Sequence, residues 1–142
     1  MSPTHRPGRH RANHEAGLDA GRVVLVTGAS RGIGVAICDA FVRDGYAVTG
    51  CGRSPRTADI PADVDYRRCD VSDPKQIRSL VEEMVTRHGR IDVLVNNAGV
   101  EIEGTVEQTT PEQWDEILTV NVRHPRCWRP RRSRTCGSWA AA

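Results

Sequence analysis

The feature that most constrains the fold is a run of four large apolar residues, Val23 to Val26, followed directly by a glycine-rich turn. An unbroken run of this kind, three of its four residues β-branched, is typical of a strand that is covered on both faces, as in a parallel sheet. The turn reads TGASRGIG over residues 27–34, and an amphipathic pattern starts within it. The order of strand, glycine-rich turn and helix predicts the first βαβ unit of an α/β protein.

Two helices are predicted by apolar spacing and end signals. The first has apolar residues at positions 33, 36, 37, 40 and 41, which is the stripe of a helix packed on one face, and Gly45 supplies its stop. The second begins at Ser72 or Asp73 with Pro74 in its first turn and stops at Gly89. Its stripe consists of residues 77, 80, 81, 84 and 85.

Further strands are predicted at residues 47–51, 65–69 and 91–96. A last helix opens at Thr110-Pro111 and carries Trp114, Ile117 and Leu118 on one face. Strands that alternate with helices indicate right-handed crossovers. The predicted fold class is therefore α/β, a Rossmann-type parallel sheet with flanking helices, order 3-2-1-4, truncated after about four strands with an unpaired apolar edge.

The glycines of the turn suit a bound dinucleotide. Gly28 permits a tight turn, Gly32 lets the backbone approach a pyrophosphate, and Gly34 allows close packing of helix on strand. The positive end of the helix would face the phosphates. The alternative is a purely structural glycine turn, but the strand before it and the helix after it favour dinucleotide binding.

Three motifs, TGASRGIG at 27–34, Cys69-Asp70-Val71 and Asn96-Asn97-Ala98-Gly99, stand in the order and spacing of one family. From about residue 21 to residue 122 the chain resembles the short-chain dehydrogenase/reductase family. The resemblance implies an oxidoreductase that passes hydride between a nicotinamide cofactor and a small carbonyl or alcohol substrate. It also implies that Asn121 matches the family's active-site asparagine.

Most of the expected cofactor contacts follow from the same resemblance. Asp70 and Val71 would meet the adenine, and Asn97, Ala98 and Gly99 would line the adenosine side. For Asn97 and Gly99 a structural role at the end of the fourth strand weighs equally. The full set of expected cofactor residues is Gly28, Ser30, Arg31, Gly32, Ile33, Gly34, Arg53, Asp70, Val71, Asn97, Ala98 and Gly99.

Charge favours NADP(H) over NAD(H). An NAD site places an acid about 20 residues beyond the glycines to bind the ribose 2′-hydroxyl, whereas an arginine accommodates a 2′-phosphate. This chain has Arg53 at that position and Arg31 in the glycine turn. The alternative is that both arginines are solvated surface charges.

Carbonyl reduction in this family uses a Tyr-x-x-x-Lys pair and a preceding serine. The chain has one lysine, Lys75, and two tyrosines, Tyr46 and Tyr66, none at that spacing. The 142 residues are therefore expected to be inactive by themselves. The alternatives are a non-catalytic NADP-binding module and, less favoured, a nucleic-acid binder.

The two ends are predicted to lie outside the nucleotide-binding part at 21–122. Residues 1–20 are polar and are expected to form a disordered basic leader. Residues 123–142 are arginine-rich, with six arginines and no acid after residue 121. A one-base shift turns the codons of Cys127, Trp128, Cys136 and Trp139 into codons for leucine, methionine or valine, so an out-of-frame tail is favoured over a nucleic-acid arm.

The remaining expectations concern location and partners. The five cysteines form no CxxC pair and no disulfide framework, and no segment resembles a secretory signal or a membrane span. A cytoplasmic protein without a metal site or a membrane partner is expected. Relatives in the family are usually homo-oligomers, through helices that are broken or missing here.

Overall fold

The computed structural model describes residues 21–124 and residue 128. The predicted leader at 1–20, and the predicted tail beyond residue 124 apart from Trp128, lie outside the described residues. No helix within the described part is both long and apolar enough to cross a membrane.

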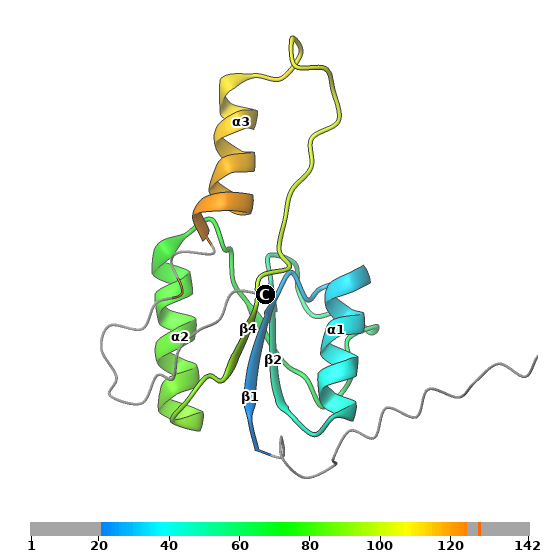
Figure 1. Cartoon of the computed structure of the whole chain (residues 1–142), viewed down its shortest axis with the longest axis vertical. Coiled ribbons are helices and arrows are strands. Elements are labelled where there is room, and N and C mark those ends of the chain that lie inside the picture. The colour runs from blue at the N-terminus through cyan, green and yellow to red at the C-terminus, as the bar shows by residue number, and fades with distance from the viewer. Residues whose placement is uncertain (1–20, 125–127, 129–142) are drawn as a thin grey trace, which may run out of the picture.

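A four-stranded parallel sheet lies at the centre of the molecule (Figure 1). Its strands are β1 (Val23–Thr27), β2 (Ala47–Gly52), β3 (Asp65–Arg68) and β4 (Val93–Val95). The order is β3-β2-β1-β4, and every pair is parallel. The predicted fold class and strand order are confirmed.

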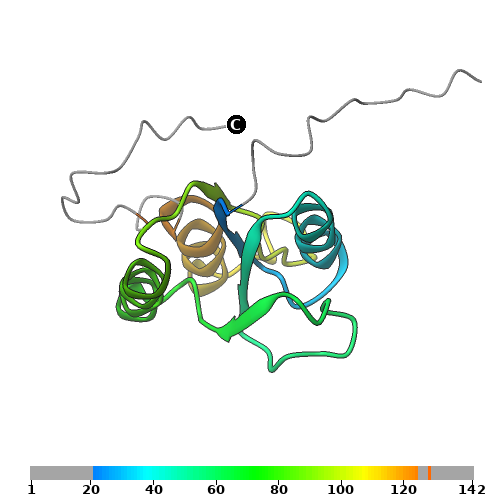
Figure 2. The same ribbon diagram turned by 90° about the horizontal axis from the view of Figure 1, so that it is seen from below.

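Two helices, α1 (Gly32–Arg43) and α2 (Pro74–His88), cover opposite faces of this sheet (Figure 2). The α1 face includes Val24 and Val26 of β1, and the α2 face includes Val23 and Leu25. These side chains alternate between the faces because successive residues of a strand point to opposite sides. Both faces of β1 are therefore buried, as its apolar run predicts.

The signals for α2 are confirmed in detail. The Asp73 carboxylate accepts a hydrogen bond from the Lys75 backbone N–H, Pro74 is the first helical residue, and Gly89 ends the helix with φ +73°. The stripe packs on the sheet: residues 77, 80, 81 and 84 are buried and residue 85 is half-buried.

The stripe predicted for α1 is partly wrong. Ile33 is 73% exposed, and Ala36 and Ala40 are also exposed. The buried side of the helix centres on Gly34 and Cys38, with residues 35, 37, 41 and 42 half-buried. The small residues Gly34 and Cys38 let α1 lie close to the sheet, so the contact face is rotated by about one residue from the predicted stripe.

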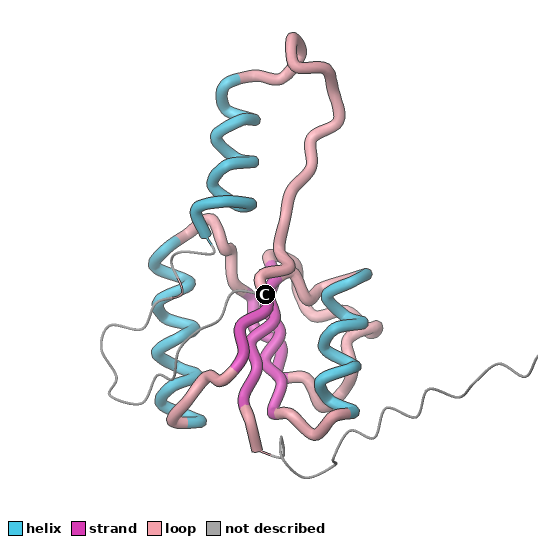
Figure 3. Tube along the Cα trace, in the orientation of Figure 1, coloured by secondary structure: helices cyan, strands magenta, loops and turns pink. Residues whose placement is uncertain are grey.

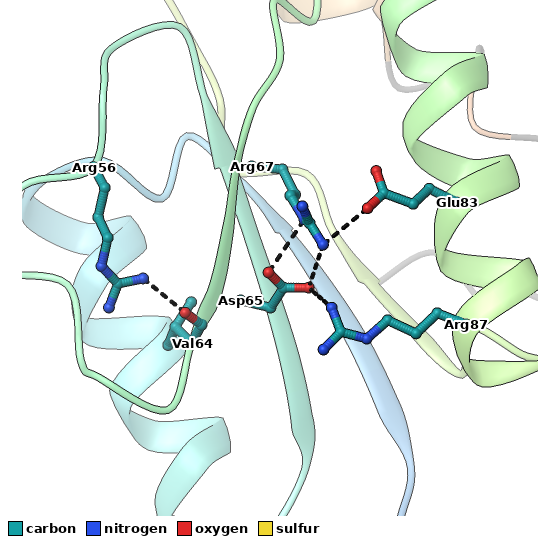
Figure 4. A network of polar contacts seen from close by, with 6 residues as sticks. All are labelled: Arg56, Val64, Asp65, Arg67, Glu83 and Arg87. Atoms are coloured by element: carbon teal, nitrogen blue, oxygen red, sulfur yellow. Dashed lines mark hydrogen bonds and ion pairs between the residues drawn. The ribbon is translucent and has the colours of Figure 1, made fainter.

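Polar side chains join α2 to β3, the strand at one end of the strand order (Figure 4). The Asp65 carboxylate pairs with Arg67 of its own strand, and with Arg87 of α2 at 2.6 Å. Arg67 also reaches Glu83 of α2 at 2.8 Å. Nearby, the Arg56 guanidinium donates to the Val64 carbonyl at 2.7 Å and so braces the loop that leads into β3.

The strand β4 is shorter than predicted, with three residues, and within the described part it pairs only with β1. Its start is fixed by Asp92, whose carboxylate accepts the Val23 N–H at 2.8 Å. Burial raises the pKa of this carboxyl, but hydrogen bonds from Arg90 and from the Val23 N–H outweigh burial and hold the pKa below its usual value.

A long loop leads from β4 to α3 (Pro111–Leu118), which stands beyond the carboxyl ends of the strands (Figure 3). The helix starts at Thr110-Pro111, as predicted, and Thr110 and Gln113 form a complete capping box there. The predicted apolar face is largely uncovered, since Trp114 is 44% and Leu118 is 40% exposed. A π-helical turn, η1 (Thr119–Arg123), follows and buries Val120.

Candidate cofactor site

An open cavity of about 570 Å³ lies where the strands end, between the glycine turn and the loops after β2, β3 and β4. The structure brings all the predicted cofactor residues to this cavity. They are Gly28, Ser30, Arg31, Gly32, Ile33, Gly34, Arg53, Asp70, Val71, Asn97, Ala98 and Gly99. These positions span more than 70 residues of sequence, and only the parallel sheet makes them neighbours, because parallel strands end at the same edge.

The glycine turn depends on two close backbone approaches. Gly28 has φ +66°, and a Cβ on it would lie 2.8 Å from the Ala98 Cα. A Cβ on Gly34 would lie 2.1 Å from the Gly28 carbonyl oxygen. The turn can therefore close only with glycine at both positions.

Gly32 and the start of α1 have a different character. Gly32 has φ +54°, lines the cavity, and a Cβ on it would meet no atom within 4 Å. Arg31, the N-cap residue, makes no side-chain capping bond, and the first turn carries no acid. A helix start without a side-chain cap, beside open space, fits the pyrophosphate of a nicotinamide dinucleotide, since helix N–H groups and the helix dipole favour anions.

A compact hydrogen-bond network ties the end of β4 to the glycine turn. The Thr27 hydroxyl oxygen accepts from the backbone N–H groups of Asn97 at 3.0 Å and Ala98 at 2.9 Å. The Asn97 amide nitrogen donates to the carbonyls of Thr27 at 3.0 Å and Gly28 at 3.2 Å. Asn97 thus braces the cavity wall through its side chain, in addition to lining the cavity.

Asn121 lies in η1 and is not among the residues that line the cavity. Its amide exchanges two hydrogen bonds with Val100: the side-chain oxygen accepts the Val100 N–H, and the side-chain nitrogen donates to the Val100 carbonyl, both at 2.9 Å. A Cβ on Gly99 would lie 3.4 Å from that side-chain oxygen. Asn121 therefore holds the segment that closes the cavity on this side.

The charged groups at the end of β2 are mixed in sign. Arg53 lines the cavity and forms an ion pair with Glu116 of α3 at 3.6 Å, and both side chains are about half exposed. Asp59 also lines the cavity. An exposed pair of this kind is worth little in water, so the Arg53 guanidinium is available to another anion.

Sequence reasoning missed several cavity residues, three of them in the loop after β2. They are Gly52, Ser54, Thr57, Asp59, Cys69, Val100 and Val120. The Thr57 hydroxyl donates to the Ser30 carbonyl at 3.2 Å, and the Tyr66 hydroxyl donates to the Ser54 carbonyl at 2.9 Å. Gly52 could have been found from the sequence, because it is adjacent to the predicted residue Arg53. The residues of the loop at 54–59 could not, because the path of that loop follows no sequence periodicity.

The model of the short chain dehydrogenase family matches residues 22–125 of this chain. The chain belongs to the short-chain dehydrogenase family. Members of this family are oxidoreductases that bind nicotinamide cofactors, which agrees with the cavity described above.

Several short-chain dehydrogenase relatives are similar over the same region. One is the 3-oxoacyl-[acyl-carrier-protein] reductase FabG of Thermotoga maritima, 37% identical over 111 residues, which are 72% of this chain and 45% of the relative. Dehydrogenase/reductase SDR family member 11 of Homo sapiens is 33% identical over 71% of this chain and 43% of its own length. The chain thus spans less than half the length of these curated relatives.

Two solved structures share the fold. Ligand-free aldohexose dehydrogenase of Thermoplasma acidophilum superposes with a TM-score of 0.71 and 36% identity, over 77% of this chain and 42% of that one. A metagenomic short-chain oxidoreductase in complex with NADP gives a TM-score of 0.70 and 33% identity, over 78% of this chain and 54% of that one.

Proposed function

We propose that this chain is the NADP(H)-binding part of a short-chain oxidoreductase whose full version acts on a carbonyl or alcohol substrate. The observation that carries the proposal is a cavity that collects the glycine turn, the α1 start without a side-chain cap, and the segments at 69–71 and 97–100. When bound there, the cofactor supplies or accepts the hydride.

The chain's own residues would do three things at this site. The backbone around Gly32 and the start of α1 would hold the pyrophosphate, since Gly32 lines the cavity and the helix start has no side-chain cap. The Asn97 network and Asn121 would keep the segment at 97–100 in place against the turn. Asp70 and Val71 would meet the adenine, and Ile33, largely exposed at the cavity, would give apolar contact.

The preference for NADP(H) rests on Arg31 and Arg53, which both line the cavity. Arginine binds phosphate through paired hydrogen bonds of fixed geometry. The weak pair between Arg53 and Glu116 would exchange for a 2′-phosphate at little cost. The NADP complex of the metagenomic relative supports this choice.

The second candidate function is a non-catalytic NADP-binding module. It is favoured by the sequence, which holds no Tyr-x-x-x-Lys pair to protonate a developing alkoxide. For the 142-residue chain itself we therefore propose cofactor binding without turnover. Steady oxidation of NADPH by the purified chain with any member of a carbonyl panel would refute that proposal.

The cofactor choice is tested by fluorescence titration with NADPH and with NADH. Replacing Arg53 by alanine should weaken NADPH binding about tenfold, the size of one charge-assisted hydrogen bond, and leave NADH binding nearly unchanged. Arg43→Ala is the matched control, because Arg43 pairs with Asp39 at the exposed end of α1, away from the cavity. Equal losses of both cofactors in Arg53→Ala would refute the role of Arg53 in choosing NADP(H).

A further inference from the structure

Two cysteines far apart in the sequence meet under the cavity. Cys51 lies in β2, where it stands beside Arg67 of β3. Cys69 comes two residues after Arg67, so its side chain lies on the same face of the sheet. The Cys69 N–H donates to the Gly52 carbonyl at 2.9 Å, which holds the two backbones side by side.

The two thiols are buried in the same part of the core. Both belong to the apolar cluster under α2, where Cys51 is 0% and Cys69 is 2% exposed. Hydrogen bonding between their side chains shifts the two pKa values in opposite directions. Cys69 is also one of the residues that line the cavity, whereas Cys51 is not.

The hydrogen bond makes the two sulfurs unequal. It lowers the pKa of Cys69, because the Cys51 thiol donates to the Cys69 thiolate, and this effect outweighs the burial of Cys69. It raises the pKa of Cys51, and burial adds to that increase. Cys69 is thus the better nucleophile and Cys51 the protonated partner.

We propose that Cys51 and Cys69 form a redox-active dithiol that a peroxide, entering through the cavity, oxidises reversibly to a disulfide. The Cys69 thiolate attacks a peroxide oxygen, the O–O bond breaks, and hydroxide leaves and takes a proton, giving sulfenic acid on Cys69. The Cys51 sulfur then attacks the Cys69 sulfur, the S–O bond breaks, and water leaves with the Cys51 proton. In sum, two thiols and one hydrogen peroxide give one disulfide and two waters.

Cys38 provides an internal comparison. It lies in α1 on the opposite face of the sheet, in the cluster with Val24 and Val26. It is fully buried, and burial raises the pKa of its thiol to about 11. A thiol of this kind is a poor nucleophile and should stay reduced.

One consequence rests on the proposed function. The disulfide would draw the ends of β2 and β3 together beside Gly52 and Asp70, which both line the cavity. A bound NADP(H) would in turn cover Cys69 and slow the oxidation. Disulfide formation itself is measured without cofactor, so it can succeed even where cofactor binding fails.

The test uses the full 142-residue chain with Cys127→Ser and Cys136→Ser, which leaves three thiols. After hydrogen peroxide treatment and alkylation, we expect two of the three thiols to be lost. Trypsin should release residues 44–53, which hold Cys51, joined to residues 69–75, which hold Cys69, at a mass lower by two hydrogen atoms than the sum. Dithiothreitol should restore both thiols.

Three variants separate this dithiol from general oxidation. Cys38→Ser should keep the joined peptides, and Cys51→Ala should lose them and leave sulfenic acid on Cys69 that dimedone traps. Cys69→Ala should keep the Cys51 thiol reduced. The proposal would be overturned if the thiols of Cys51 and Cys69 were unchanged after peroxide, or if the disulfide were made through Cys38. Peptide mapping of the chain that keeps both Cys51 and Cys69 gives this answer even if one of the variants fails to fold.

Discussion

Gly34 shows how a single missing methyl group permits the turn. Glycine to alanine within a helix normally stabilises a protein by about 1 kcal/mol. At Gly34 the added Cβ would lie 2.1 Å from the Gly28 carbonyl oxygen, a backbone atom that cannot rotate away. We expect Gly34→Ala to lower the free energy of unfolding by about 1–3 kcal/mol in urea titration and to weaken NADPH binding.

The control for this prediction is Ala36→Gly, in the same helix at an exposed position. It should cost about 1 kcal/mol through helix propensity alone and leave cofactor binding intact. If Gly34→Ala had the same free energy of unfolding as the parent chain, the inference that close packing of α1 on the glycine turn requires glycine at this position would be wrong.

His124 links stability to pH. Its side chain is 2% exposed, and burial lowers its pKa below the ordinary 6.5, although a bond to the Val120 carbonyl acts in the opposite direction. The unfolded chain therefore takes up a proton at a pH where the folded chain does not. The contribution of neutral His124 to the free energy of unfolding is fully present above pH 6.5 and is lost as the pH drops below that value. The loss is about 1.4 kcal/mol per unit of separation between the pKa of His124 in the unfolded chain and its pKa in the folded chain.

The measurement is urea unfolding between pH 7.5 and pH 5 for the parent chain and His124→Gln, with Trp128→Phe as the control. Trp128 is also buried, and like His124 it has a ring nitrogen without a partner in the described part of the chain, but it does not titrate in this range. Trp128→Phe should keep the pH dependence and His124→Gln should lose it. A parent chain whose stability stays flat below pH 6.5 would contradict the assignment to His124.

Single residues also show what the sequence could and could not foretell. The glycine turn and Asn97 were found because their motifs are local, and Arg53 because its distance from the glycines is fixed. The proximity of Cys51 and Cys69 was missed, since it depends on the register of β2 with β3. The catalytic role of Asn121 stays a prediction, and its two bonds to Val100 were not foreseen because no spacing rule identifies a partner 21 positions away.

At the scale of elements, α3 depends on its ends more than α1 and α2 do. None of its residues is buried, so packing contributes little, and the capping box of Thr110 and Gln113 supplies much of its stability. Thr110→Ala should cost about 1 kcal/mol locally. We expect faster amide exchange at residues 111–118, and an unchanged midpoint for global unfolding.

Thr86→Ala in α2 is the matched control, because the Thr86 hydroxyl only bonds back to the Glu82 carbonyl within the helix. It should leave exchange in α3 unaltered. Equal exchange in α3 for Thr110→Ala and the parent chain would show that the capping box does not stabilise this helix.

The elements also differ in how well periodicity predicts them. The stripe of α2 was correct, because large side chains alternate there with charged ones. The stripe of α1 was misread because alanines count as apolar but tolerate exposure, and because Ile33 faces the cavity side and is not buried in the core. The ends of β4 were set too wide, since Asp92 and Asn97 fix the strand through side-chain bonds that a hydropathy pattern does not contain.

On the scale of the whole molecule, the sheet presents an open edge. Within the described part, β4 pairs only with β1, and Val93, Leu94 and Val95 are only half-buried. An unpaired apolar strand edge is a template for pairing with another chain. We expect the 142-residue chain to self-associate with rising concentration in sedimentation experiments, and Val93→Lys to shift it toward the monomer.

Val106→Lys is the control, because Val106 is 78% exposed in the loop before α3 and lies outside the sheet. It adds the same charge without touching the strand edge. If both lysine variants reduced association equally, net charge and not the edge of β4 would govern it.

The pairing of β1 with β4 also implies a delay during synthesis of the chain, because β1 is made before its partner strand. The Val23 N–H donates to the carboxylate of Asp92, which is 69 positions later, and the Thr27 hydroxyl accepts from the N–H groups of Asn97 and Ala98. At about 5–20 residues per second, a ribosome needs on the order of 4–14 s to make the intervening chain. During that interval the nascent β1, entirely apolar from Val23 to Val26, has no β4 beside it, which makes it a natural client for a ribosome-associated chaperone.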